Sequence, residues 1–80
     1  MNRDTATSEL KQILSEEFKT DPEAVIEAMT FKDLGIDDAE FGLMILAMED
    51  KFNIELNDDE TKRIVTVRHA LNVIVDKTGG

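Results

Sequence analysis

Three stretches of this chain place apolar residues at the spacing of an α-helix, and this pattern constrains the fold most. Residues at i, i+3, i+4 and i+7 or i+8 share one face of a helix. The three stripes with this kind of spacing are Leu10, Ile13, Leu14 and Phe18; Phe41, Ile45, Met48 and Phe52; and Val67, Ala70, Leu71 and Ile74. We expect these stripes to meet in one core. Ten of the twelve residues should form it, that is, all of them except Phe41 and Ala70.

Capping residues and helix breakers set the expected bounds of the first helix. Thr5, Thr7 and Ser8 offer N-caps. The helix should end near Lys19, because Thr20-Asp21-Pro22 interrupts the pattern. Residues 21–34 then form a long connection with room for one helical turn, packed by its own side chains. The side chains expected to pack are Val25, Ile26, Met29, Phe31 and Leu34.

The second helix has a wider apolar surface than one stripe requires. Asp37 or Asp38 can cap it, and acids at its start complement the helix dipole. It should run to about Phe52. Met44 flanks the stripe, and further apolar side chains widen the surface: Leu43, Leu46 and Ala47. Such width predicts contacts on two sides of this helix.

Two more helices complete the expected fold. Asn57 and Glu60 have the spacing of a capping box, which predicts a short third helix that ends before Ile64. Thr66 caps a fourth helix that stops near Gly79-Gly80. The sequence therefore predicts an all-α chain, a small four-helix bundle with a short third helix. We expect residues 1–80 to form one domain with its core at about 8–77.

Composition excludes several classes of function. The chain has 80 residues, no Cys and one His. It therefore has no disulfide, no thiolate metal ligand and no Cys nucleophile, and a single His argues against a catalytic dyad or a His-based metal site. No segment resembles a signal peptide, and no apolar run approaches the ~20 residues of a membrane span. We expect a cytoplasmic monomer that is not an enzyme and holds no metal.

Negative charge is concentrated in the middle of the chain. The net charge is −9. The segment 37–60 contains nine acids and one base, Lys51, and so carries −8 of this total. Nucleic acid and anionic membrane surfaces would be repelled. A solvated face is the ordinary explanation of such a run, but its concentration around one helix favours a partner with a basic surface.

The residues before the second helix closely resemble a known junction. Leu34-Gly35-Ile36-Asp37-Asp38-Ala39 is similar to the Leu-Gly-x-Asp-Ser-Leu junction of acyl carrier proteins. Phe52-Asn53-Ile54-Glu55-Leu56 and Ile64-Val65-Thr66-Val67 extend the resemblance from about Leu10 to Ile74. It implies a bundle whose second helix docks on basic surfaces of fatty-acid or polyketide biosynthetic enzymes. It also implies an interior that can accept an acyl chain.

The resemblance places Asp38 at the attachment position of the family. There a Ser hydroxyl carries 4'-phosphopantetheine, the arm that holds acyl groups as thioesters. A carboxylate has no hydroxyl to form that phosphodiester, so we expect no such cofactor on this chain. Asp38 could also supply the negative charge of the missing arm. Two origins fit this residue: a naturally degenerate carrier or an introduced change, of which the second departure, Ala39, favours the first.

The resemblance also assigns the partner-binding residues. Asp37 and Glu40 match acids of the family's junction, and Glu49 and Asp50 match acids late in the recognition helix. Gly42 and Leu43 depart from the common Val and Glu. With Phe41, they could form an apolar contact that ordinary carriers lack. The expected partner-binding residues are Asp37, Glu40, Phe41, Leu43, Glu49 and Asp50.

Two other functions remain open. The chain could be a carrier-fold interaction or regulatory protein outside lipid synthesis, or a substrate or leader that ends in Gly79-Gly80. Ser8 and Ser15 lie on the first helix, far from the junction, and do not replace the attachment residue. His69 should lie on the flank of the fourth helix. Glu55, Asn57 and Asp59 alternate like the ligands of a calcium loop, but the segment lacks the central Gly and distal Glu of such a loop.

Overall fold

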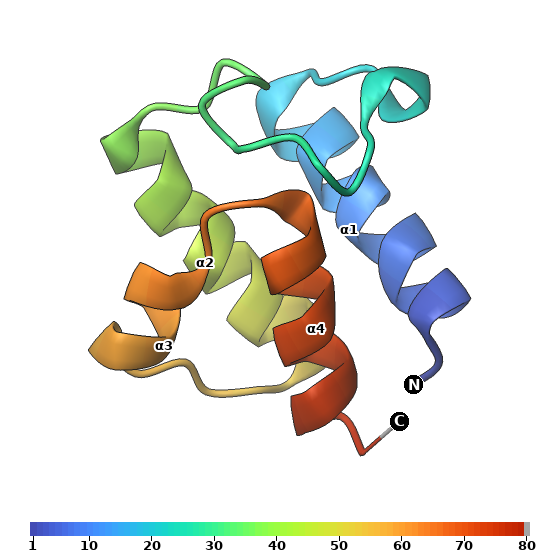
Figure 1. Ribbon diagram of the computed structural model, residues 1–80, viewed down its shortest axis with the longest axis vertical. Helices are drawn as coiled ribbons and strands as arrows, with labels where there is room; N and C mark the ends of the chain where they lie inside the picture. The colour runs from blue at the N-terminus through green and yellow to red at the C-terminus, as the bar shows by residue number, and fades with distance from the viewer. Residues whose placement is uncertain (80) are drawn as a thin grey trace.

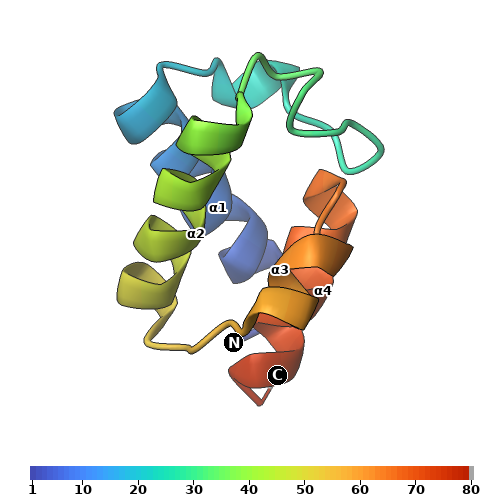
Figure 2. The same cartoon turned by 90° about the vertical axis from the view of Figure 1, so that its left-hand side faces the viewer.

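The part of the chain that the structure describes folds into four α-helices and one short 3₁₀ turn, and the predicted all-α bundle is confirmed. The computed structural model describes residues 1–79. The elements are α1 (Arg3–Phe18), η1 (Pro22–Ala24), α2 (Asp38–Phe52), α3 (Asp58–Arg63) and α4 (Val67–Lys77). In Figure 1 the long connection before α2 crosses one end of the bundle, while the start of α1 and the end of α4 lie at the other. Turned by 90°, Figure 2 shows α3 beside α4, across from α2.

The helix ends follow local capping, with one prediction wrong. α1 begins at Arg3 because Asn2 is its N-cap, so Thr5, Thr7 and Ser8 lie within the helix rather than before it. Its end is as predicted, with Lys19 in the left-handed conformation at φ 57°. At the other end of the chain, α4 stops at Lys77 and Gly79 follows with φ 77°. Gly80, the second residue of the predicted stop, lies outside the described residues.

Both remaining capping predictions for the later helices are confirmed. Asn57 caps α3 and its side chain accepts from Glu60 N–H, with the reciprocal bond from Glu60 present. Thr66 caps α4 through His69 N–H. The side chain of His69 completes this second box by accepting from the backbone N–H of Thr66. His69 is exposed, as expected for the flank of α4.

The core lies where α1, α2 and α4 meet. Nine of the ten residues predicted for it are buried, and the tenth, Phe18, is partly buried against it. The buried side chains with no measurable exposure include Leu14, Met48, Leu71 and Ile74. Met44 is also fully buried, whereas Phe41 is only partly buried. The three apolar stripes therefore meet as their spacing predicts.

The long connection is packed more selectively than the sequence suggests. Val25 and Phe31 are buried, but Ile26 is 60% exposed, so its predicted packing is wrong. The backbone of the connection reaches α4, since Val67 N–H donates to Met29 O and Arg68 N–H donates to Glu27 O. These bonds hold the connection across the end of the bundle from which α2 starts.

Candidate functional site

The junction before α2, residues 30–36, is a hydrogen-bonded turn that we call the hook. Thr30 and Asp33 exchange two bonds, from Thr30 N–H to Asp33 Oδ2 and from Asp33 N–H to Thr30 Oγ1, both at 3.0 Å. Gly35 takes φ 82°, a left-handed conformation that suits glycine. Ile36 N–H then returns to Phe31 O at 3.0 Å, and both side chains are buried. The hook fixes the direction in which the chain enters α2.

The structure separates the roles of the two adjacent aspartates. Asp37 is the N-cap: its Oδ1 accepts from Glu40 N–H at 2.8 Å, and Glu40 Oε1 accepts from Asp37 N–H at 3.3 Å. Asp38 is the first residue inside α2 and is exposed. Asp38 therefore does not cap the helix, and of the two predicted caps only Asp37 acts. The Asp38 carboxylate instead lies in the first turn, where a negative charge is stabilised by the dipole.

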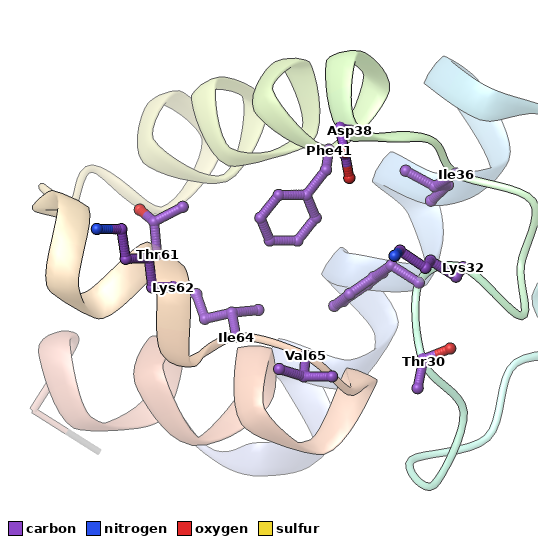
Figure 3. Close-up of a pocket in the computed structure, with 10 residues that line it drawn as sticks. Thr30, Lys32, Ile36, Asp38, Phe41, Thr61, Lys62, Ile64 and Val65 are labelled. Atoms are coloured by element: carbon purple, nitrogen blue, oxygen red, sulfur yellow. The ribbon is translucent and has the colours of Figure 1, made fainter.

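A pocket of about 340 Å³ opens beside Asp38. Its apolar lining comes from the hook, α2 and the α3–α4 connection: Phe31, Ile36, Phe41, Ile64 and Val65. Figure 3 shows Asp38 and Phe41 on the α2 side of this space, with Ile64 and Val65 opposite. The rings of Phe31 and Phe41 have centroids 5.7 Å apart. The pocket can accept an apolar group next to a carboxylate.

Several of the acids predicted to bind a partner also have structural roles within the chain. Asp37 and Glu40 form the capping box, and Glu49 Oε2 accepts from Leu56 N–H at 3.0 Å. Asp50 is exposed on α2. Lys51, the only base of the segment 37–60, forms an ion pair with Glu9 of α1, with 3.1 Å between Lys51 Nζ and Glu9 Oε2. The positive charge of Lys51 is thus directed at α1, and the outer face of α2 stays acidic.

Apolar side chains interrupt this acidic face. Leu43 is 60% exposed and Leu46 is 61% exposed. These two gain no second buried contact within the described chain, so the contact predicted on a second side of α2 stays a prediction for them. Phe41, the remaining predicted partner-binding residue, turns toward the pocket and is partly buried. Leu46 is the exposed residue that the sequence assigned to packing, and its one-turn spacing from Leu43 was the signal for a shared face.

The remaining candidates are placed away from the junction. Ser8 and Ser15 lie on α1, which contributes no lining to the pocket beside Asp38. Among the described residues, no group of three or more His, Cys, Asp or Glu side chains is arranged to hold a metal ion. No described helix has both the length and the apolar character needed to cross a membrane.

Comparison with known proteins identifies the family. A family model described as "Phosphopantetheine attachment site" matches residues 8–74. The chain belongs to the acyl carrier protein family. It is 31% identical over 78 residues to the acyl carrier protein of Thermosynechococcus vestitus, covering 96% of each chain. It is 36% identical over 67 residues to that of Wolinella succinogenes, covering 82% of this chain and 88% of the relative.

Solved acyl carrier proteins have the same fold. The crystal structure of the acyl carrier protein of Thermotoga maritima matches with a TM-score of 0.87 at 29% identity, covering 99% of this chain and 93% of that one. The acyl carrier protein of Enterococcus faecalis matches with a TM-score of 0.79 at 28% identity, covering 96% and 99%. Acyl carrier proteins are carriers rather than enzymes, so the prediction of a non-enzymatic chain is confirmed.

Proposed function

We propose that this protein docks on acyl-processing enzymes through the outer face of α2 and does so without a phosphopantetheine arm. The observation that carries the proposal is Asp38: the exposed first residue of α2, directly after the N-cap, has a carboxylate and no hydroxyl. The family membership supports the docking, and the residue type at position 38 supports the absence of the arm.

The residues at the junction do not fit covalent attachment of the cofactor. A phosphodiester to the arm needs a hydroxyl at the start of α2, and the two serines of the chain are both on α1. The nearby Thr30 Oγ1 accepts from Asp33 N–H within the hook. Asp38 supplies a single negative charge at the start of the helix, as the phosphodiester would. The docking electrostatics can therefore persist although the cargo is lost.

The pocket beside Asp38 could bind an acyl chain that a partner enzyme carries, since its walls are mostly apolar. A regulatory protein outside lipid synthesis is the second candidate. The two exposed leucines on α2 favour it, because a surface that only repels and attracts by charge does not need them. In both cases we expect a cytoplasmic monomer that meets a basic partner surface.

Competition for docking tests the proposal. A phosphopantetheinyl transferase would modify a serine-bearing acyl carrier protein in the presence of excess of this protein, at several salt concentrations. We expect this protein to slow the reaction as a competitor, and the effect to weaken as salt rises, because exposed charges are screened over ~8 Å at physiological ionic strength. Absence of competition at low salt would contradict docking on this class of enzyme.

Two matched variants locate the docking face. Asp50→Lys reverses an exposed charge on α2, and Glu17→Lys reverses an exposed charge on α1. Exposed ion pairs contribute about 0.2–1 kcal/mol each, so Asp50→Lys should weaken competition roughly two- to fivefold. Glu17→Lys should leave it nearly unchanged. Equal effects of the two variants would show that net charge, rather than α2, determines the competition.

A further inference from the structure

The outer face of α2 carries four uncharged residues in a line. Ala39, Gly42, Leu43 and Leu46 are spaced at i, i+3, i+4 and i+7, which places them on one side of the helix. All four are exposed. The core stripe of α2 lies on the opposite side, so this line is separate from the packing of the bundle. It has the spacing with which one helix packs on another.

Gly42 has no role inside the chain that would require glycine. Its φ lies outside the left-handed region, and a Cβ built on it would have no atom of the described residues within 4 Å. Glycine in the interior of a helix is nevertheless less stable than alanine. The absence of a side chain at this point leaves the backbone of α2 open to a close approach from outside.

Acids surround this uncharged line. Asp38 and Glu49 flank the Gly42 side, Glu40 flanks the other side, and Asp50 follows Leu46 by one helical turn. The nearby base Lys51 is paired with Glu9 of α1. A second copy of α2 would bring acids against acids, so charge disfavours self-association. A partner with basic residues on both sides of an apolar stripe has complementary charge.

We propose that a basic amphipathic α-helix of the partner crosses α2 at Gly42. Its apolar side chains pack on Leu43 and Leu46, and its Lys or Arg side chains face Asp38, Glu40 and Asp50. The inference rests on the proposed use of α2 for docking and specifies what docks there. Gly42 sets the approach distance, and Leu43 and Leu46 select an apolar centre over a purely ionic one.

A synthetic helical peptide tests the geometry. The probe is a helix of about 20 residues with a leucine stripe, an alanine at its centre and Lys and Arg on both flanks. We expect it to shift the backbone NMR signals of Ala39, Gly42, Leu43 and Leu46 in the labelled protein. Replacing the central alanine of the peptide by leucine, or its basic flanks by Glu, should weaken binding.

Variants of the protein supply the decisive contrast. Gly42→Ala should raise the melting temperature, because alanine favours the helix, and yet weaken peptide binding about fivefold or more by blocking the close approach. Leu43→Glu should weaken binding by a similar factor. Ile26→Glu is its matched control, since Ile26 is also 60% exposed but lies on the connection before α2; this variant should bind as the unmodified protein does.

Three results would overturn the inference. They are equal binding by Gly42→Ala, signal changes confined to other elements, and no binding by millimolar peptide. Sedimentation showing a dimer that buries Leu43 would also overturn it, because the occupant would then be a second copy. The first three results leave the competition with a working carrier unaffected, so failure of this inference is distinguishable from failure of the proposed function. A dimer would also reduce that competition, and Leu43→Glu would then restore the monomer.

Discussion

Asp37 and Asp38 are adjacent residues of one type, yet they act differently because the backbone enters α2 between them. Asp37 has extended backbone angles (φ −81°, ψ 178°) and aims its carboxylate at the N–H of Glu40. Asp38 is already inside the helix, and its exposed side chain lies at the edge of the pocket. A cap satisfies an orphan N–H group, whereas a charge in the first turn interacts only with the dipole.

This difference predicts unequal costs of the two truncations. Asp37→Ala should lower the free energy of unfolding by about 1 kcal/mol through loss of the cap. Asp38→Ala removes only a favourable charge near the helix start. It should lower the free energy of unfolding by ~0.3–1 kcal/mol at low salt, and by less as the salt concentration rises. Urea denaturation of both variants measures this. A larger loss for Asp38→Ala would contradict the assignment of the cap.

The prediction left both caps open, although the sequence favours Asp37: Glu40 follows it at the spacing of a capping box, whereas Phe41 stands at that place after Asp38. The hook adds a second constraint, since the left-handed Gly35 and the buried Ile36 set the path into the helix. Those contacts are tertiary. The family resemblance pointed to position 38 but did not specify its backbone environment. The structural role of Glu49 toward Leu56 was not predictable from the charge pattern.

At the scale of elements, helix ends with a polar cap followed by periodic apolar residues were predictable. The bounds of α2 and α4 follow this rule. The short α3 has no apolar residue and was predicted from its capping box alone. The start of α1 did not, because its first turn, Arg3–Ala6, has Ala6 as its only buried residue and lacks a stripe. Asn2 caps α1 with a side-chain bond to Thr5 N–H that has no signature beyond residue type. The start of α1 was missed because neither an apolar stripe nor a capping-box glutamate marks it.

The start of α4 depends on His69. Its Nδ1 accepts from Val65 N–H at 3.2 Å and from Thr66 N–H at 3.3 Å. His69→Ala removes this acceptor and should lower the free energy of unfolding by about 0.5–1.5 kcal/mol, with faster amide exchange at Val65 and Thr66. His69→Gln retains an acceptor at this capping-box position and should preserve most of the stability. Equal damage by both variants would contradict the capping role.

For the whole molecule, an ionic cluster ties the connection before α2 to two helices. Glu27 pairs with Arg3 of α1 and with Arg68 of α4. The hydrogen bond from Arg3, together with the charges of Arg3 and Arg68, lowers the pKa of the Glu27 carboxyl. Glu60 of α3 pairs with Lys77 of α4. The hydrogen bonds that Glu60 accepts from Lys77 and from the backbone N–H of Asn57 lower the pKa of its carboxyl.

These lowered pKa values predict weakening in acid. Because the folded-state pKa lies below that of the unfolded chain, the two carboxylates stabilise the fold above the ordinary glutamate pKa of about 4.3. This stabilisation is lost as the pH falls through the lower folded-state pKa. Between pH 6 and pH 3, the free energy of unfolding should therefore fall less for the double variant Glu27→Gln, Glu60→Gln than for the unmodified protein. Parallel curves would contradict it.

The global arrangement was the most predictable part of the molecule. The stripes on α1, α2 and α4 are each sufficient to locate a buried face, and three such faces close into one core. Ile26 shows the limit: it lies in an irregular segment without a period, and a neighbour such as Val25 can take the buried place. The exposed face of α2 was similarly ambiguous, since apolar residues there fit either a second packing contact or a docking surface.

The intact mass of the protein after incubation with a phosphopantetheinyl transferase and coenzyme A tests the central claim most directly. A serine-bearing acyl carrier protein serves as the positive control, and Asp38→Ser shows whether the rest of the junction supports modification. We predict no change in mass for the unmodified chain, because Asp38 has no hydroxyl. A gain of one phosphopantetheine group on that chain would contradict the account.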